Sequence, residues 1–155
     1  MLSREKDQEL CRKFPLLYRD RNGDRSKTLM VYGFSIKEGW YSIVYELSAA
    51  LEPLIAAQLK SSLMFKSKVI LYKALKYFGL KVVVPQKQSA CAMQVKEKFG
   101  GLRFYMAGPQ TKEMSYLIRQ AEEKSFNTCE VCAAQGVLRT EKRWMLTLCD
   151  TCDSK

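Results

Sequence analysis

Four cysteines near the C-terminus constrain the fold of this chain more than any other feature. Cys129, Cys132, Cys149 and Cys152 form two Cys-x2-Cys pairs separated by sixteen residues, which is the spacing of a closed four-thiolate zinc site. Two residues between paired cysteines let both sulfur atoms point at one ion from a tight turn. A segment as short as 127–155 buries too little apolar surface to fold unaided, so the pattern predicts that a metal ion stabilises it.

The ligand set must be all sulfur, because the 155-residue chain contains no histidine. Four thiolates complete a tetrahedron around Zn²⁺ and leave no position for an activated water, which predicts a structural zinc site and not a catalytic one. A redox-active or disulfide pair and an iron–sulfur site use the same residues and stay open as alternatives.

The first residues contain no apolar stretch like that of a signal peptide, and no long apolar run occurs elsewhere. Export and membrane insertion are therefore not expected. We expect a cytoplasmic protein, in a compartment where paired cysteines bind metals more often than they form disulfides.

The missing histidine also removes the usual acid and base of enzymes that work at neutral pH. Cys11 and Cys91 are predicted to be small buried apolar residues, although Arg12 and Lys13 could activate the thiol of Cys11. Neither a glycine-rich phosphate loop nor a cluster of carboxylates is present. We predict that the chain is not an enzyme; the alternative is a nuclease or transferase built from carboxylates, lysines and tyrosines.

The periodicity of apolar residues predicts an α+β fold, in which a small antiparallel sheet packs with helices and a zinc ribbon or knuckle follows. Helices are predicted over 4–13, from residue 40 to 55 with a kink or a break at Pro53, over 62–78 and over 111–125. Strands are predicted over 28–36 and 80–85, and a hairpin over 93–106.

The chain divides into a predicted globular domain, residues 1–126, and a zinc-binding module, residues 127–155. Within the module, 136–140 and 143–148 are predicted to form a short second hairpin. Trp144 is expected to pack beside the metal site, with stacking on a nucleic-acid base as the alternative.

The formal net charge of +10 is concentrated in the middle of the chain. Residues 53–112 hold eleven lysines and arginines against Glu97 alone, whereas the remaining segments balance at fifteen basic and fifteen acidic residues. Such a concentration favours an acidic or polyanionic partner, although a solvated lysine surface explains it as well. The predicted partner-binding residues lie on the helix over 62–78 and on the outward face of the hairpin: Lys66, Lys73, Lys76, Lys96, Lys98, Arg103 and Tyr105.

Three motifs carry a resemblance to a known group of proteins: residues 39–41 (Gly-Trp-Tyr), residues 94–105 around Lys-Glu-Lys-Phe-Gly, and the two cysteine pairs. Together they resemble small proteins of tailed phages and prophages that join such a hairpin to a C-terminal zinc knuckle. The resemblance covers residues 28–152. The chain departs from it at Ala133, where a knuckle often has glycine, and in its lysine-rich central helix.

A phage accessory origin implies a small protein that acts on a component of its bacterial host cell. We expect stoichiometric binding to a host protein that has an acidic or nucleic-acid-binding surface, for example inhibition of a bacterial defence system in the manner of an anti-CRISPR. The alternative partner is DNA or RNA, whose phosphates the basic residues would neutralise.

Overall fold

The computed structural model describes the backbone of residues 1–77, 89–141 and 143–154, and the side chains in these ranges except at 62–77. The fold is α+β, as predicted. Its elements follow in the order α1 (Arg4–Lys13), two 3₁₀ turns (Met30–Tyr32 and Glu38–Trp40), α2 (Tyr41–Tyr77), β1 (Cys91–Lys98), β2 (Gly101–Ala107), α3 (Lys112–Ser125), β3 (Val137–Arg139), β4 (Leu146–Leu148) and α4 (Asp150–Asp153).

The predicted central hairpin is confirmed as an antiparallel pair of strands, β1 and β2. Val95 faces Phe104 across the pair, so both side chains lie on the same face of the sheet, where they are buried with Leu102 and Met106. Met93, which was expected in the same set, is only half-buried, because the strand register shifts between Ala92 and Gln94.

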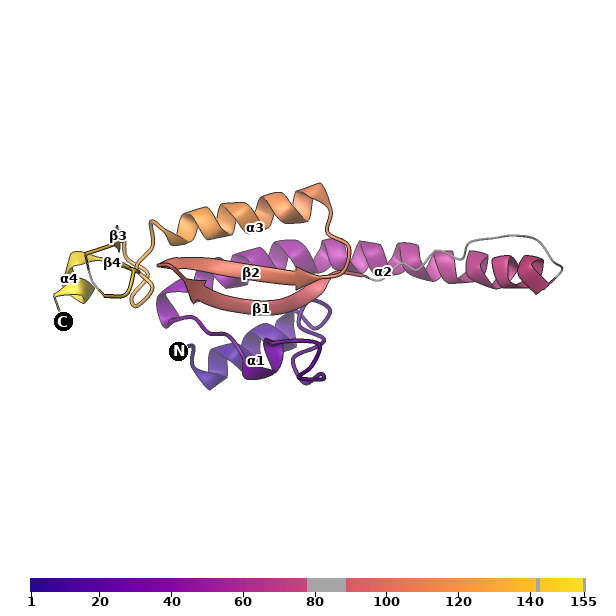
Figure 1. Ribbon diagram of the computed structural model, residues 1–155, viewed down its shortest axis with the longest axis horizontal. Helices are drawn as coiled ribbons and strands as arrows, with labels where there is room; N and C mark the ends of the chain where they lie inside the picture. The colour runs from indigo at the N-terminus through magenta and orange to yellow at the C-terminus, as the bar shows by residue number, and fades with distance from the viewer. Residues whose placement is uncertain (78–88, 142, 155) are drawn as a thin grey trace.

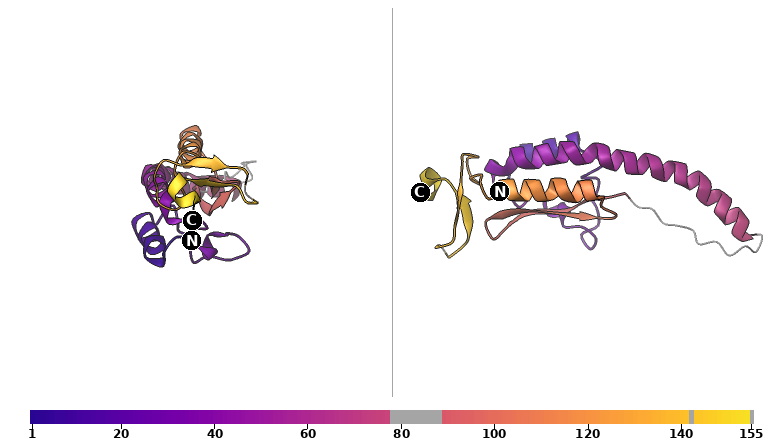
Figure 2. Two further views of the ribbon diagram at one scale, coloured as in Figure 1. Left: turned by 90° about the vertical axis from the view of Figure 1, so that its left-hand side faces the viewer. Right: turned by 90° about the horizontal axis from the view of Figure 1, so that it is seen from above.

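Helices cover one face and one edge of the hairpin (Figure 1; Figure 2, right). α2 lies behind the sheet, whereas α3 runs along the outer edge of β2. Along that edge, the backbone N–H of Leu102 donates to Ser125 Oγ at 2.8 Å, and that of Phe104 donates to Glu122 Oε1 at 3.0 Å. Two side chains of α3 therefore satisfy backbone donors that would otherwise leave an open sheet edge.

The other edge of the hairpin is covered by residues 28–36, and the predicted strand there is wrong. The Thr28 hydroxyl accepts from the N–H of Met30 and stabilises a 3₁₀ turn, and Gly33 then takes a φ of +80°. Backbone pairing with β1 is limited to a parallel bridge between Ser35 and Lys96, in which Ser35 N–H donates to the Val95 carbonyl, and to a bond from Leu29 N–H to the Met93 carbonyl.

α2 is one continuous helix of 37 residues, so the prediction that residues 62–77 are helical is confirmed, and the prediction that they form a separate helix is wrong. Pro53 does not end the helix; its side chain is exposed and the helix curves gently along its length (Figure 2, right). The predicted strand over 80–85 lies outside the described residues. Among the described residues, we found no helix with both the length and the apolar character needed to cross a bilayer.

The core lies between the hairpin, the first half of α2, α1 and α3. α1 has the predicted bounds, although its N-cap Ser3 makes no side-chain capping bond. The side chains that are almost fully buried come from every one of these elements: Leu10, Leu17, Met30, Ile36, Trp40, Ile43, Leu51, Ile55, Leu102 and Met114.

We predict that Ser125→Ala destabilises the protein by about 1–3 kcal/mol, because it leaves the buried Leu102 N–H without its acceptor. Urea denaturation would measure the free energy of unfolding. Ser115→Ala on the exposed side of α3 is the matched control and should change it by less than about 0.5 kcal/mol. Equal effects of the two substitutions would contradict the role given to Ser125.

Candidate metal centre and the surface beside it

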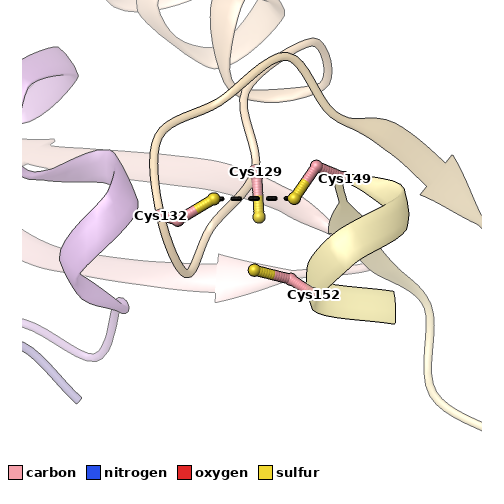
Figure 3. A group of neighbouring side chains, drawn as sticks. All are labelled: Cys129, Cys132, Cys149 and Cys152. Atoms are coloured by element: carbon pink, nitrogen blue, oxygen red, sulfur yellow. Dashed lines mark hydrogen bonds between the residues drawn. The ribbon is translucent and has the colours of Figure 1, made fainter. Parts of the chain in front are cut away.

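The four cysteines predicted as metal ligands converge in space (Figure 3). Their sulfur atoms all lie within 4.8 Å of one another, and those of Cys132 and Cys149 are 3.5 Å apart. Four thiolates around one tetrahedral ion with bonds of about 2.3 Å would be separated by about 3.8 Å. The group could therefore hold a metal ion with only small adjustments. All four are free thiols and not disulfides.

Local structure explains why each pair points inward. Residues 129–134 form a tight turn in which Cys129 N–H donates to the Ala134 carbonyl and Ala133 N–H donates back to the Cys129 carbonyl. The second pair lies at the start of a helix, since Cys149 is the N-cap of α4 and Cys152 is in its first turn. The predicted hairpin, β3 and β4, joins the two pairs.

Backbone donors around Cys129 favour its thiolate form. Burial by itself opposes ionisation, but the N–H groups of Cys149, Cys132 and Val131 donate to the sulfur and outweigh it, so that its pKa falls to about 6. Hydrogen bonds with Cys132 and Cys149 raise the pKa of Cys152 to about 12 by favouring its protonated form. Since metals bind thiolates, the donors at Cys129 match the chemistry of a ligand.

The knuckle is docked on the globular part through residues 37–40. Gly39 N–H donates to the Glu130 carbonyl at 2.9 Å, and the buried Trp40 indole donates to the Thr128 carbonyl at 2.8 Å. The Glu130 carboxylate is only 1% exposed and pairs with Lys37. In the sequence, Gly39 and Trp40 were only part of the resemblance to phage proteins. In the structure, they position the sulfur cluster.

Trp144 lies against the central hairpin instead of in the place that the sequence suggested. Its side chain is 67% exposed, and its indole N–H is 3.5 Å from Glu97 Oε2 near the end of β1. The tryptophan that contacts the knuckle is Trp40. The expectation was wrong because sequence proximity to the cysteines does not determine which side of β4 the indole faces.

The outward face of the hairpin brings together the four predicted residues that lie on it. Lys96 is directly opposite Arg103, and Lys96 Nζ lies 5.6 Å from the centre of the Tyr105 ring. Lys98 follows two positions after Lys96, on the same face. In Figure 1 this face is turned toward the viewer, and no described helix crosses it. The side chains of Lys66, Lys73 and Lys76 lie outside the described part of the chain.

Cys91 is buried, as the sequence predicted, whereas Cys11 is only half-buried. Burial raises the pKa of each thiol to about 11, and a neighbouring carboxylate, Asp7 or Asp20, adds to the effect. Both thiols are therefore protonated at neutral pH and poor nucleophiles.

Sequence reasoning missed Phe99 as a surface residue, since it was assigned only to a turn. Its side chain is 59% exposed and its φ is +55°, a left-handed conformation that is unusual for an aromatic residue. No sequence pattern signals this, because Asn or Asp is the residue expected at that position of such a turn.

Comparison with protein-family models, with curated proteins and with solved structures found no match to this chain. Inferences about its function therefore depend on the site itself.

Ala133 has a φ of +65° in the knuckle turn, a conformation that glycine adopts at little cost. We predict that Ala133→Gly raises the free energy of unfolding of the metal-loaded protein by about 0.5–1 kcal/mol. Ala134→Gly is the matched control, because Ala134 is the next residue in the same turn and its own φ is not positive; there the added flexibility should destabilise by about 0.5–1 kcal/mol. Effects of the same sign in both variants would contradict this account.

Proposed function

We propose that this chain is a non-enzymatic binding protein, stabilised by one structural zinc ion, that holds an acidic partner on the outward face of the β1–β2 hairpin. The observation that carries the proposal is the juxtaposition of Lys96 and Arg103, both half-buried, across the strands, with Lys98 and Tyr105 on the same face, which no described helix crosses. Cations held on a rigid hairpin lose little freedom when they pair with carboxylates or phosphates.

Zinc is the metal that we propose for the sulfur cluster. Four thiolates from two Cys-x2-Cys pairs are the usual ligands of structural zinc, and such a closed set would leave no coordination position for water. The ion would join the turn at 129–134 to α4, and so hold the module in shape without taking part in chemistry.

We predict that the purified protein binds one zinc ion per chain and that Cys132→Ser abolishes this stoichiometry, as measured by metal analysis. At free zinc about 1,000 times Kd, binding stabilises by about 4 kcal/mol, so a chelator should lower the melting temperature by roughly 8–16 °C. Cys11→Ser, which changes a thiol outside the cluster, should keep its zinc. Retention of zinc by Cys132→Ser, or iron in the wild-type protein, would refute the assignment.

The resemblance to phage and prophage proteins supports a host protein as the acidic partner. In this proposal the chain acts in the cytoplasm of the bacterial host cell and blocks one component, such as a nucleic-acid-binding protein of a defence system, by occupying its surface. Exposed tyrosine, tryptophan and arginine side chains, which the described surface offers at Tyr105, Trp144 and Arg143, are the types that dominate protein interfaces.

DNA or RNA is the second candidate, and it is favoured by one specific observation. The cations of the hairpin stand beside exposed aromatic rings, with Lys96 over Tyr105 and Lys98 Nζ at 5.1 Å from the centre of the Phe99 ring. Cations with interleaved aromatic residues suit a strand that offers phosphates and bases together.

We predict that charge reversal of the hairpin face, in the double variant Lys96→Glu and Arg103→Glu, abolishes partner binding. The measurement is capture of host proteins from a nuclease-treated bacterial lysate, and binding of inorganic polyphosphate between 50 and 200 mM salt. Loss of a few anion contacts should reduce polyphosphate affinity by about tenfold or more at low salt.

The matched control reverses Lys60 and Lys112, two exposed lysines on helices, and therefore changes the net charge equally. This control should bind as the wild-type protein does. If both double variants lost binding to the same extent, net charge alone would account for the attraction and the proposed face would be rejected.

A further inference from the structure

Beside the outward face, the tip of the central hairpin and the β3–β4 hairpin enclose an apolar hollow of about 370 Å³. Phe99, Trp144 and Met145 form its apolar walls, and Lys98 and Arg143 stand at its rim. The three apolar side chains are 59%, 67% and 41% exposed, respectively. These residues, named here the tip site, come from two hairpins that are far apart in the sequence.

Phe99 is held at the tip site at a cost to the backbone. Phe99 and Gly100 form a two-residue loop with φ values of +55° and +73°, which is the type I′ pattern. An L-residue with a bulky side chain is disfavoured there, whereas Asn or Asp is favoured. Strain at an exposed aromatic residue, in a turn that other residues would stabilise, is typical of a functional position.

Trp144 forms a wall between two hollows. One is the tip site, and the other, also about 370 Å³, is lined by Ile36, Lys37 and Leu146 together with Trp144. The indole N–H is 3.5 Å from Glu97 Oε2, and the ring borders both hollows. An indole exposed in this way is a platform for flat groups.

The charges around the tip site select an anionic ligand that carries such groups. Lys98 lies over the Phe99 ring, and Arg143 lines the same hollow. The carboxylate of Glu97 also lines it, but it accepts from the N–H of Gly100 at 2.7 Å and from the Trp144 indole, which reduces its repulsion of an anion. The hairpin face with Lys96 and Arg103 adjoins this end of β1.

We infer that the tip site binds single-stranded nucleic acid, with unpaired bases stacked on Trp144 and Phe99 and phosphates paired with Lys98 and Arg143. Bases in a duplex keep their faces covered by their neighbours, so only an unpaired strand can stack on both rings. This inference rests on the second candidate function, binding of DNA or RNA, and specifies the unpaired strand as the form that is bound.

A thymidine dodecamer labelled with a fluorophore tests the inference by anisotropy and by intrinsic fluorescence. Trp40 is fully buried and Trp144 is 67% exposed, so stacking should quench the emission of Trp144. Trp144→Ala should weaken dodecamer binding roughly 5- to 150-fold, the effect of losing one stacked base. Its affinity for inorganic polyphosphate, which has no bases, should stay within about twofold of the wild-type value because its cations are intact.

Phe99→Asn separates binding from folding. Asn is favoured in a type I′ loop, so this variant should melt at the wild-type temperature or above it, and yet bind the dodecamer at least about fivefold more weakly. Tyr116→Ala, which removes an aromatic ring that is 53% exposed on α3, is the matched control and should bind normally.

The inference would be overturned if Trp144→Ala bound the dodecamer as tightly as the wild-type protein does, and if the dodecamer did not quench the tryptophan fluorescence of the wild-type protein. The proposed hairpin face would then still stand if Lys96→Glu with Arg103→Glu abolished polyphosphate binding. Capture of an acidic host protein through Trp144, with no affinity for the dodecamer, would also overturn the inference and assign the tip site to a protein partner.

Discussion

The close docking of the cysteine knuckle on residues 37–40 is the contact on which the arrangement of this protein depends. A Cβ at Gly39 would lie 2.2 Å from the Cys129 carbonyl oxygen, so only glycine allows the two backbones to approach this closely. The approach makes the bond from Gly39 N–H to the Glu130 carbonyl, and it buries the Glu130 carboxylate against Lys37. A metal ion in the knuckle would therefore order the globular surface beneath it as well as its own ligands.

A second contact fixes the knuckle against the tip of the central hairpin. The Thr147 hydroxyl donates to the Gly100 carbonyl at 2.6 Å, and a Cβ at Gly100 would lie 2.3 Å from Leu138 Cδ1. Phe99 is exposed and lines the same hollow as Trp144. The exposed aromatic residues thus result from the way in which two hairpins meet. The stability of the metal module and the shape of the candidate binding surface are coupled, because the contact between Thr147 and Gly100 joins the two hairpins.

Prediction from the sequence succeeded where local pattern and local structure coincide. The helix ending at Ser125, the hairpin over 93–106 and the convergence of the cysteines were all predicted correctly, because each depends on spacing within one short segment. Prediction failed at residues 28–36, where the Thr28 hydroxyl stabilises a 3₁₀ turn, and at Pro53, which lies on the exposed side of α2 without ending the helix. In both places the local structure depends on a hydroxyl group or on exposure to solvent. The spacing of apolar residues carries no information about either.

The sequence by itself determined the ligand set, the hairpin and the lack of a histidine acid or base, because residue identity and spacing are sufficient for these. Only the tertiary structure decided which tryptophan supports the knuckle and which one reaches solvent, since Trp40 is distant from the cysteines in the sequence whereas Trp144 is close to them. It also decided that Phe99 of the central hairpin and Trp144 of the β3–β4 hairpin line one hollow. Faces and neighbours of this kind arise from packing between segments distant in the chain, and local sequence carries no record of them.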